Sequence, residues 1–146
     1  GFVHVFSLSC ESDFPNAPSG NLLDTETQVN WLKNDLAAVN RSITPWIVVQ
    51  CHRSWKGSIA IQGLWDGGKK TADYINPDGP IYITNGAIGN PEGNDYVSKR
   101  SSDSCRIITD PGFGILTLIN AGHATFSFYR TSDLVELDRI NIIKAR

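Results

Sequence analysis

The chain has 146 residues, of which 40% are hydrophobic and 19% are charged, and this composition excludes an intrinsically disordered protein. The length is that of one domain, so we expect residues 1–146 to form a single domain. A formal net charge of −2 excludes the strongly basic surface of most nucleic-acid-binding proteins. We expect no nucleic-acid partner and no membrane partner, because no apolar run approaches the roughly 20 residues that span a bilayer.

The first third of the chain predicts a strand, a helix and a second strand. Residues 2–9 are rich in β-formers and nearly alternate, whereas residues 11–24 contain turn formers without a period. A helical period follows over residues 26–39 and ends before Pro45. Residues 46–51 are β-formers flanked by helix breakers and predict a buried strand. The apolar stripe of the predicted helix consists of Val29, Leu32, Leu36 and Val39.

These three elements have the order of a βαβ unit, in which the two strands lie parallel and the crossover is right-handed. Thr25 and Gln28 have the spacing of a capping box at the start of the helix, and Asp24 is an alternative cap. His52 directly follows the second strand. Functional residues collect beyond the carboxyl ends of parallel strands, so His52 is a candidate site residue.

The middle of the chain is harder to assign. Residues 53–79 contain several glycines and two tryptophans without clear periodicity, and we expect a long irregular excursion. Residues 81–84 predict a strand, and Asn85-Gly86 predicts the turn after it. Residues 89–106 are rich in Ser, Asn and Asp and predict a loop.

The last third predicts three strands joined by turns as an antiparallel meander. We expect Phe126 and Phe128 to share one face. We expect Ile140 and Ile142 to share another. The fold class is therefore α/β, a βαβ unit plus a C-terminal antiparallel meander. The three strands are expected over residues 115–120, 124–129 and 137–143.

Cysteine spacing and a sequon bear on the compartment. The three cysteines have no zinc-ribbon spacing and allow at most one internal disulfide, and we interpret them as buried small side chains. Asn40-Arg41-Ser42 is an N-glycosylation sequon, which makes Asn40 a candidate glycosylation site in a secreted protein. The cysteines are Cys10, Cys51 and Cys105.

The chain has three histidines, which limits metal and acid–base chemistry. His4 lies within a predicted strand and is interpreted as structural, whereas His123 is interpreted as a solvated turn residue. His52 is thus the histidine that we expect to take part in a functional site. The carboxylates beyond it have no recognisable ligand spacing, so no metal cluster is expected from them. These carboxylates are Asp66, Asp73 and Asp78.

Two tryptophans in the predicted excursion, Trp55 and Trp65, allow two interpretations. Core packing is one. The other is an exposed aromatic platform that stacks on a sugar or a base, with Asp66 supplying hydrogen bonds. Residues 85–90 are glycine-rich after a strand, but a plain turn fits them better than a phosphate loop.

An ordered series of motifs covers nearly the whole chain, including Thr44-Pro45-Trp46, His52-Arg53-Ser54-Trp55 and Tyr82–Ala87. These motifs resemble those of the C-terminal half of purple acid phosphatases, which are binuclear metallophosphoesterases, and Glu11–Pro15 fits the fungal branch. The other matching positions are Gln28, Trp31-Leu32, Asp35-Leu36, Arg41, Gly89–Gly93, Phe113-Gly114, Leu116-Thr117, Asn120 and Asp138.

The resemblance implies half of a metallophosphoesterase β-sandwich in which His52 aligns with one metal ligand of the family. Four further ligands would precede Gly1, and the family's closing histidine pair has no counterpart because residues 53–80 contain no histidine. We therefore expect no cofactor, and Fe, Zn or Mn only if the family site is completed. The absent half predicts a homodimer or a lost N-terminal companion segment.

Three functional hypotheses follow. The first is a secreted, degenerate phosphatase-like protein, non-catalytic, that binds a ligand such as a carbohydrate. The second is an acid phosphomonoesterase fragment whose metal-dependent site around His52 needs a missing segment or a partner. The third is a proteolytic product without a separate role, suggested by the absence of a starting methionine. The residues expected to bind the carbohydrate are Trp55, Trp65, Asp66 and Asn85.

Overall fold

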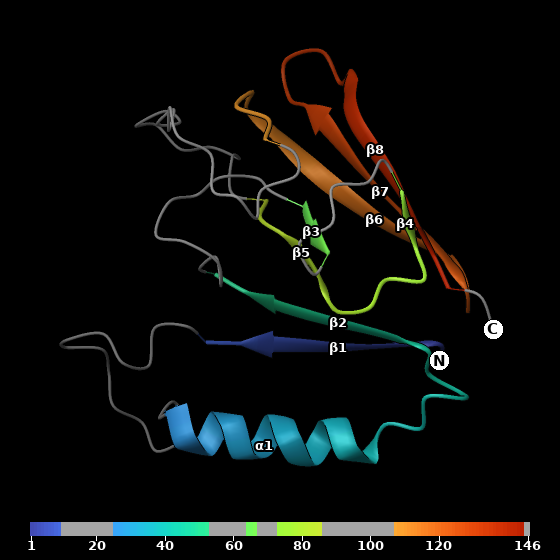
Figure 1. Ribbon diagram of the computed structural model, residues 1–146. Coiled ribbons are helices and arrows are strands. Elements are labelled where there is room, and N and C mark those ends of the chain that lie inside the picture. Colours follow the sequence, from blue (N-terminus) through green and yellow to red (C-terminus); the bar gives the residue numbers. More distant parts are fainter. Residues whose placement is uncertain (10–24, 53–63, 67–72, 86–106, 145–146) are drawn as a thin grey trace, which may run out of the picture. The chain divides into compact units, whose positions relative to one another are not determined.

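The structure is a computed structural model that divides into two compact units (Figure 1). The first unit is Gly1–Trp55 and the second is Lys56–Arg146, and each is described by itself below. The α/β class predicted from the sequence, with a βαβ unit and an antiparallel meander, is confirmed. The residues that the structure describes are 1–9, 25–52, 64–66, 73–85 and 107–144.

The first unit holds a parallel pair of strands connected by a helix. The strands β1 (Val3–Leu8) and β2 (Trp46–Cys51) pair in register from Val3 opposite Trp46 to Leu8 opposite Cys51. The helix α1 (Thr25–Ala38) lies between the two strands in sequence. It runs antiparallel to both of them (Figure 1). The predicted strand–helix–strand order is thus confirmed, and the predicted helix boundaries shift by one residue at each end.

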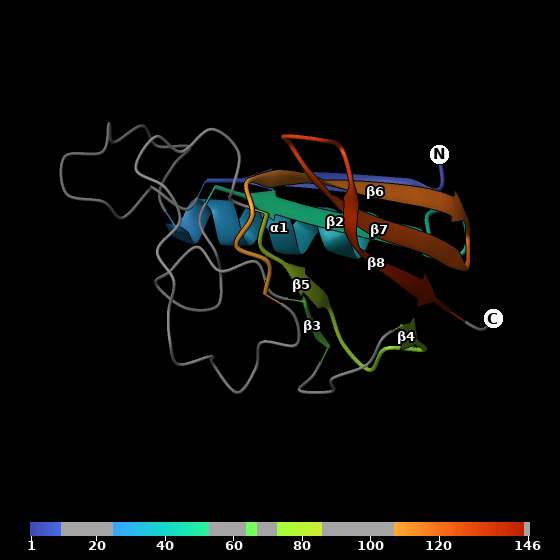
Figure 2. The same cartoon turned by 90° about the horizontal axis from the view of Figure 1, so that it is seen from above.

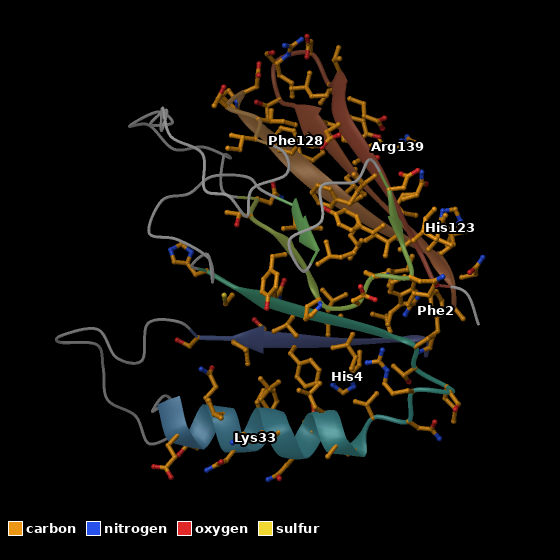
Figure 3. The ribbon with its side chains drawn as sticks, in the orientation of Figure 1. Phe2, His4, Lys33, His123, Phe128 and Arg139 are labelled. Carbon is orange, nitrogen blue, oxygen red and sulfur yellow. The ribbon has the colours of Figure 1, made fainter. Side chains whose placement is uncertain are left out.

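Aromatic and ionic contacts attach α1 to β1. Phe6 is almost fully buried, and its ring meets Trp31 of α1 edge-on with centroids 5.9 Å apart. His4 stacks on Phe6 at 4.5 Å, and its Nε2 lies 2.9 Å from a carboxylate oxygen of Asp35 on α1. Figure 3 shows His4 extending from β1 toward the helix. The interpretation of His4 as a structural histidine is confirmed.

The other face of β1 is apolar and exposed. His4 and Phe6 contact α1, so the alternate residues Val3 and Val5 lie on the face of the strand away from the helix. Val3 is 37% exposed and Val5 is 54% exposed. One face of this sheet is therefore covered by α1, and the valines of β1 are not buried on the other.

The second unit contains a four-stranded sheet with the order β4-β8-β7-β6 (Figure 2). Strands β6 (Gly112–Asn120), β7 (His123–Arg130) and β8 (Glu136–Ile143) form the predicted antiparallel meander. The two-residue strand β4 (Tyr74–Ile75) adds to β8 in parallel and was not predicted.

A second short sheet also lies within the segment predicted to be irregular. Strand β3 (Leu64–Asp66) pairs antiparallel with β5 (Ile81–Ile83), the strand expected over residues 81–84. The prediction of an irregular excursion over residues 53–79 is therefore wrong at β3 and β4. Strands of three and two residues are too short to produce a visible alternation of apolar side chains.

The core of the meander lies on one face of the sheet. Phe126 of β7 is directly opposite Ile140 of β8, and directly opposed residues place their side chains on the same face. The expectation that the isoleucine pair occupies a different face from the phenylalanine pair is thus wrong, because the register of β7 and β8 places Ile140 directly opposite Phe126. The buried hydrophobic residues of this unit are Tyr74, Ala124, Phe126, Phe128, Ile140 and Ile142.

Two glycines of β6 allow these phenylalanine rings to lie flat across the neighbouring strand. A Cβ built at Gly112 would overlap the ring of Phe128 and the carbonyl oxygen of Tyr129. A Cβ built at Gly114 would overlap the ring of Phe126. The absence of side chains at these two positions is therefore required for the aromatic rings to be buried.

An arginine closes the turn after β7. Arg130 donates from both Nε and Nη2 to the carboxylate of Asp133, and its Nη1 lies 3.3 Å from Asp110. These hydrogen bonds raise the pKa of Arg130 and lower that of Asp133. Leu134, which is 64% exposed, has a positive φ of 60° in this turn. Paired charges thus hold a backbone conformation that leucine rarely adopts.

His123 differs from its predicted role. It is half-buried, begins strand β7, and its Nε2 lies 3.3 Å from Oδ1 of Asn141. The amide of Asn141 donates to Asp73, so Oδ1 is the atom left for the imidazole. His123 is therefore part of a chain of hydrogen bonds in the sheet rather than a solvated turn residue.

Replacing Gly112 with alanine is expected to lower the free energy of unfolding by about 1–3 kcal/mol, the usual cost of overfilling a packed site. The added methyl group would meet both a ring and a backbone carbonyl oxygen. Gly79→Ala is the control, because a Cβ at Gly79 meets nothing within 4 Å. Chemical denaturation of both variants tests this, and equal stability of the two would contradict the packing argument.

Candidate functional site

The carboxyl edge of the parallel strand pair is the first candidate site. Leu8 and Cys51 form the last pair of the ladder, and Ser9 and His52 follow them. Parallel strands bring these two following residues to the same edge of the sheet. The His52 side chain is exposed. The placement predicted for His52 at the end of a parallel strand is thus confirmed, whereas its function is not tested.

Gln28 of α1 fixes the chain at this edge. Its Oε1 accepts a hydrogen bond from the backbone N–H of Ser9 at 2.7 Å. Its Nε2 donates to the carbonyl oxygen of the same residue at 2.8 Å. The predicted capping box between Thr25 and Gln28 is therefore wrong, since the Gln28 amide bonds the end of β1 instead of the start of its own helix.

The cysteine beside His52 is half-buried. Cys51 is not disulfide-bonded. Cys10 and Cys105, like the predicted loop residue Trp55, lie outside the described residues. Cys51 is therefore only partly buried, whereas a buried side chain was expected there from the sequence.

The second candidate site lies on the short sheet of the other unit. Trp65 of β3 is opposite Tyr82 of β5, and Asp66 is opposite Ile81. Asn85 lies two residues beyond the end of β5 and is exposed. Trp65 and Asp66 therefore belong to the short sheet, and Asn85 follows the sheet in sequence.

Asn85 also has a place in the packing of this unit. Its Nδ2 lies 3.2 Å from the position that a Cβ would occupy at Gly114 of β6. The amide therefore lies close to the backbone of the meander.

The described residues do not fit a metal centre. No three His, Cys, Asp or Glu side chains within these ranges are grouped so that they could hold a metal ion. His4 is bonded to Asp35, and His123 to Asn141. Asp73, one of the carboxylates considered beyond His52, accepts bonds from both the backbone and the side-chain amide of Asn141. His52 belongs to no such group within the described ranges, and one imidazole cannot assemble a binuclear site.

The described chain also lacks a membrane-spanning helix. The helix α1 has 14 residues, and no helix in the described ranges is long and apolar enough to cross a bilayer.

Comparisons with known proteins identify the relatives of this chain. The sequence model of the family described as "Iron/zinc purple acid phosphatase-like protein C" matches residues 79–139, which include Asn85 and run from before β5 into β8. Acid phosphatase A of Cryphonectria parasitica is 25% identical over 99% of this chain and 38% of its own length. Purple acid phosphatase 18 of Arabidopsis thaliana is 28% identical over 90% of this chain and 35% of its own length.

A solved structure agrees with these sequence matches. Purple acid phosphatase PPD1 from yellow lupin (Lupinus luteus) seeds superposes with a TM-score of 0.75 over 99% of this chain and 31% of the lupin chain. At 16% identity this match shows the fold. The chain is thus similar to purple acid phosphatases over nearly its whole length, and the predicted resemblance is confirmed. It spans less than two fifths of the length of each of these three relatives.

Replacing Gln28 with alanine is expected to destabilise the first unit by about 1–2 kcal/mol, since two partly buried hydrogen bonds each contribute about 0.5–1.5 kcal/mol. Hydrogen exchange at the Ser9 amide is expected to become faster. Lys33→Ala, an exposed position on the same helix (Figure 3), is the control and should leave both quantities unchanged. Unaltered exchange at Ser9 in Gln28→Ala would contradict a role for the amide pair.

Proposed function

We propose that this chain is a degenerate, non-catalytic member of the purple acid phosphatase-like family, acting outside the cell by binding a carbohydrate. The matches above support the relationship to this family, and the binding function is the proposal. The supporting observation is the state of the three histidines in the chain. His4 is bonded to Asp35 and lies opposite Ile47 of β2, five residues before His52, so these two imidazoles do not converge on one ion. His123 is bonded to Asn141 in the other unit.

The proposed binding surface is the sheet formed by β3 and β5. It carries Trp65 and Asp66 on one strand and leads to Asn85 at the end of the other. A tryptophan face provides an apolar platform for a sugar ring, and carboxylate and amide groups bond its hydroxyls. Because consecutive residues of a strand alternate between the two faces of a sheet, the proposed ligand meets Trp65 on one face and reaches Asp66 around the edge of β3.

The binding function is tested with the purified chain on a glycan array, followed by titration calorimetry with the best ligand. Trp65→Ala is expected to weaken binding about tenfold or more, because loss of one aromatic stacking contact costs about 1–3 kcal/mol. Trp31→Ala is the matched control, since Trp31 is 50% exposed on α1 in the other unit. Binding to no glycan, or equal binding by wild type and Trp65→Ala, would contradict the proposal.

The alternative function is acid phosphomonoester hydrolysis by a site completed by another chain segment or a partner. One observation favours it. His52, which aligns with a metal ligand of the family, is exposed at the carboxyl edge of β1 and β2, where α/β proteins place their ligands. The residues that the structure describes supply no further ligand group around it.

Metal content separates the two functions. After dialysis, mass spectrometry of the purified chain is expected to find iron, zinc and manganese far below one ion per chain, because a lone imidazole binds them weakly. The chain is also expected not to hydrolyse a chromogenic phosphate monoester at acidic pH. Stoichiometric metal together with hydrolysis that His52→Ala abolishes and His123→Gln retains would establish the phosphatase instead.

A further inference from the structure

The turn between α1 and β2 carries Asn40-Arg41-Ser42, the single Asn-x-Ser/Thr triplet of the sequence. We propose that Asn40 is an N-linked glycan attachment site, modified by an oligosaccharide carried on a lipid diphosphate. This inference rests on the extracellular route included in the proposed function. It concerns a different surface from the proposed binding residues.

The acceptor side chain lies outside the helix and is accessible. The helix α1 ends at Ala38, and both Asn40 and Ser42 are exposed. Oδ1 of Asn40 accepts a hydrogen bond from the backbone N–H of Ser42 at 3.0 Å. This Asx turn occupies the amide oxygen. The amide nitrogen of Asn40 makes no hydrogen bond to another residue in the described part of the chain, and it is the atom that accepts the sugar.

The reaction uses groups that this turn presents. Nδ2 of Asn40 attacks the anomeric carbon of the first sugar, and a carbon–nitrogen bond forms. The bond from that carbon to the diphosphate oxygen breaks, and the lipid diphosphate leaves with the electron pair. One amide proton passes to a base of the transferring enzyme. Oδ1 takes no part, so its bond to the Ser42 backbone persists in the product.

Neighbouring side chains leave the acceptor uncovered. Nη2 of Arg41 donates to the carbonyl oxygen of Pro45 at 2.8 Å, which holds the guanidinium against the turn's own backbone. Ile43 is 65% exposed beside the acceptor. A glycan on Asn40 would shield this isolated apolar side chain from water, which gives the modification a physical benefit at this position.

The glycan would be remote from the His52 edge. Asn40 precedes β2, whereas His52 follows it. The strand has six residues, and at a rise of about 3.3 Å per residue its first and last residues are roughly 17 Å apart. Glycosylation at Asn40 is thus compatible with ligand access to the carboxyl edge of the first unit.

The test expresses the chain behind a secretory leader in a eukaryotic host and measures the intact mass of the secreted protein. The expected result is the added mass of one oligosaccharide, removed by peptide N-glycosidase with conversion of Asn40 to aspartate. Asn40→Gln and Ser42→Ala should each lose the whole addition, and Ser42→Thr should retain it. Asn34→Gln is the matched control, because Asn34 is exposed on α1 outside any sequon.

A secreted, folded wild-type chain without the added mass would overturn the inference, as would retention of the addition in Asn40→Gln. The supplied leader makes the outcome independent of the natural export route. Glycan-array binding by the Asn40→Gln chain tests the proposed function separately. A modified chain that binds no glycan would leave the attachment site intact and remove the binding proposal.

Discussion

Parallel pairing of β1 with β2 is the constraint that fixes the geometry of the first unit. Parallel strands cannot be joined by a tight turn, so the chain must return along a crossover, here through α1. That return places both strand ends at one edge, where Gln28 bonds Ser9 beside His52. It also places the exposed turn at Asn40 at the opposite end. The parallel pairing of β1 and β2 therefore places the His52 edge and the Asn40 turn at opposite ends of this unit.

The second unit depends on a different constraint, the close approach of aromatic rings to a glycine backbone. Gly112 and Gly114 leave room for Phe128 and Phe126 to cover strand β6. The rings then form a core together with Ile140, directly opposite Phe126. A flat aromatic cover of this kind needs correct strand register as well as missing side chains. The position of these aromatic rings therefore depends on how the strands are paired and not on the sequence of any single strand.

The sequence predicts the elements of this fold better than their contacts. Residues 46–51 are identified correctly because β-formers stand between helix breakers, and the structure has this strand with the same bounds. The Gln28–Ser9 bonds join residues 19 positions apart, and no local pattern indicates them. The role of His123 was likewise missed, because its hydrogen bond to Asn141 depends on how two strands are paired. Short-range periodicity carries no information about such partners.

The same distinction between elements and contacts bears on function. A binuclear phosphatase needs many side chains to converge on two ions, and a shared fold supplies the scaffold for that convergence without supplying the ligands. In this chain His4 is bonded to Asp35 on α1 and His123 is bonded to Asn141 on β8, and the described residues group no three side chains that could hold a metal ion. Binding a sugar requires less: an aromatic face and a few oriented polar groups on a rigid element. Trp65 and Asp66 lie on β3, and Asn85 follows its partner strand β5, so a binding function needs fewer converging groups from this chain than hydrolysis does.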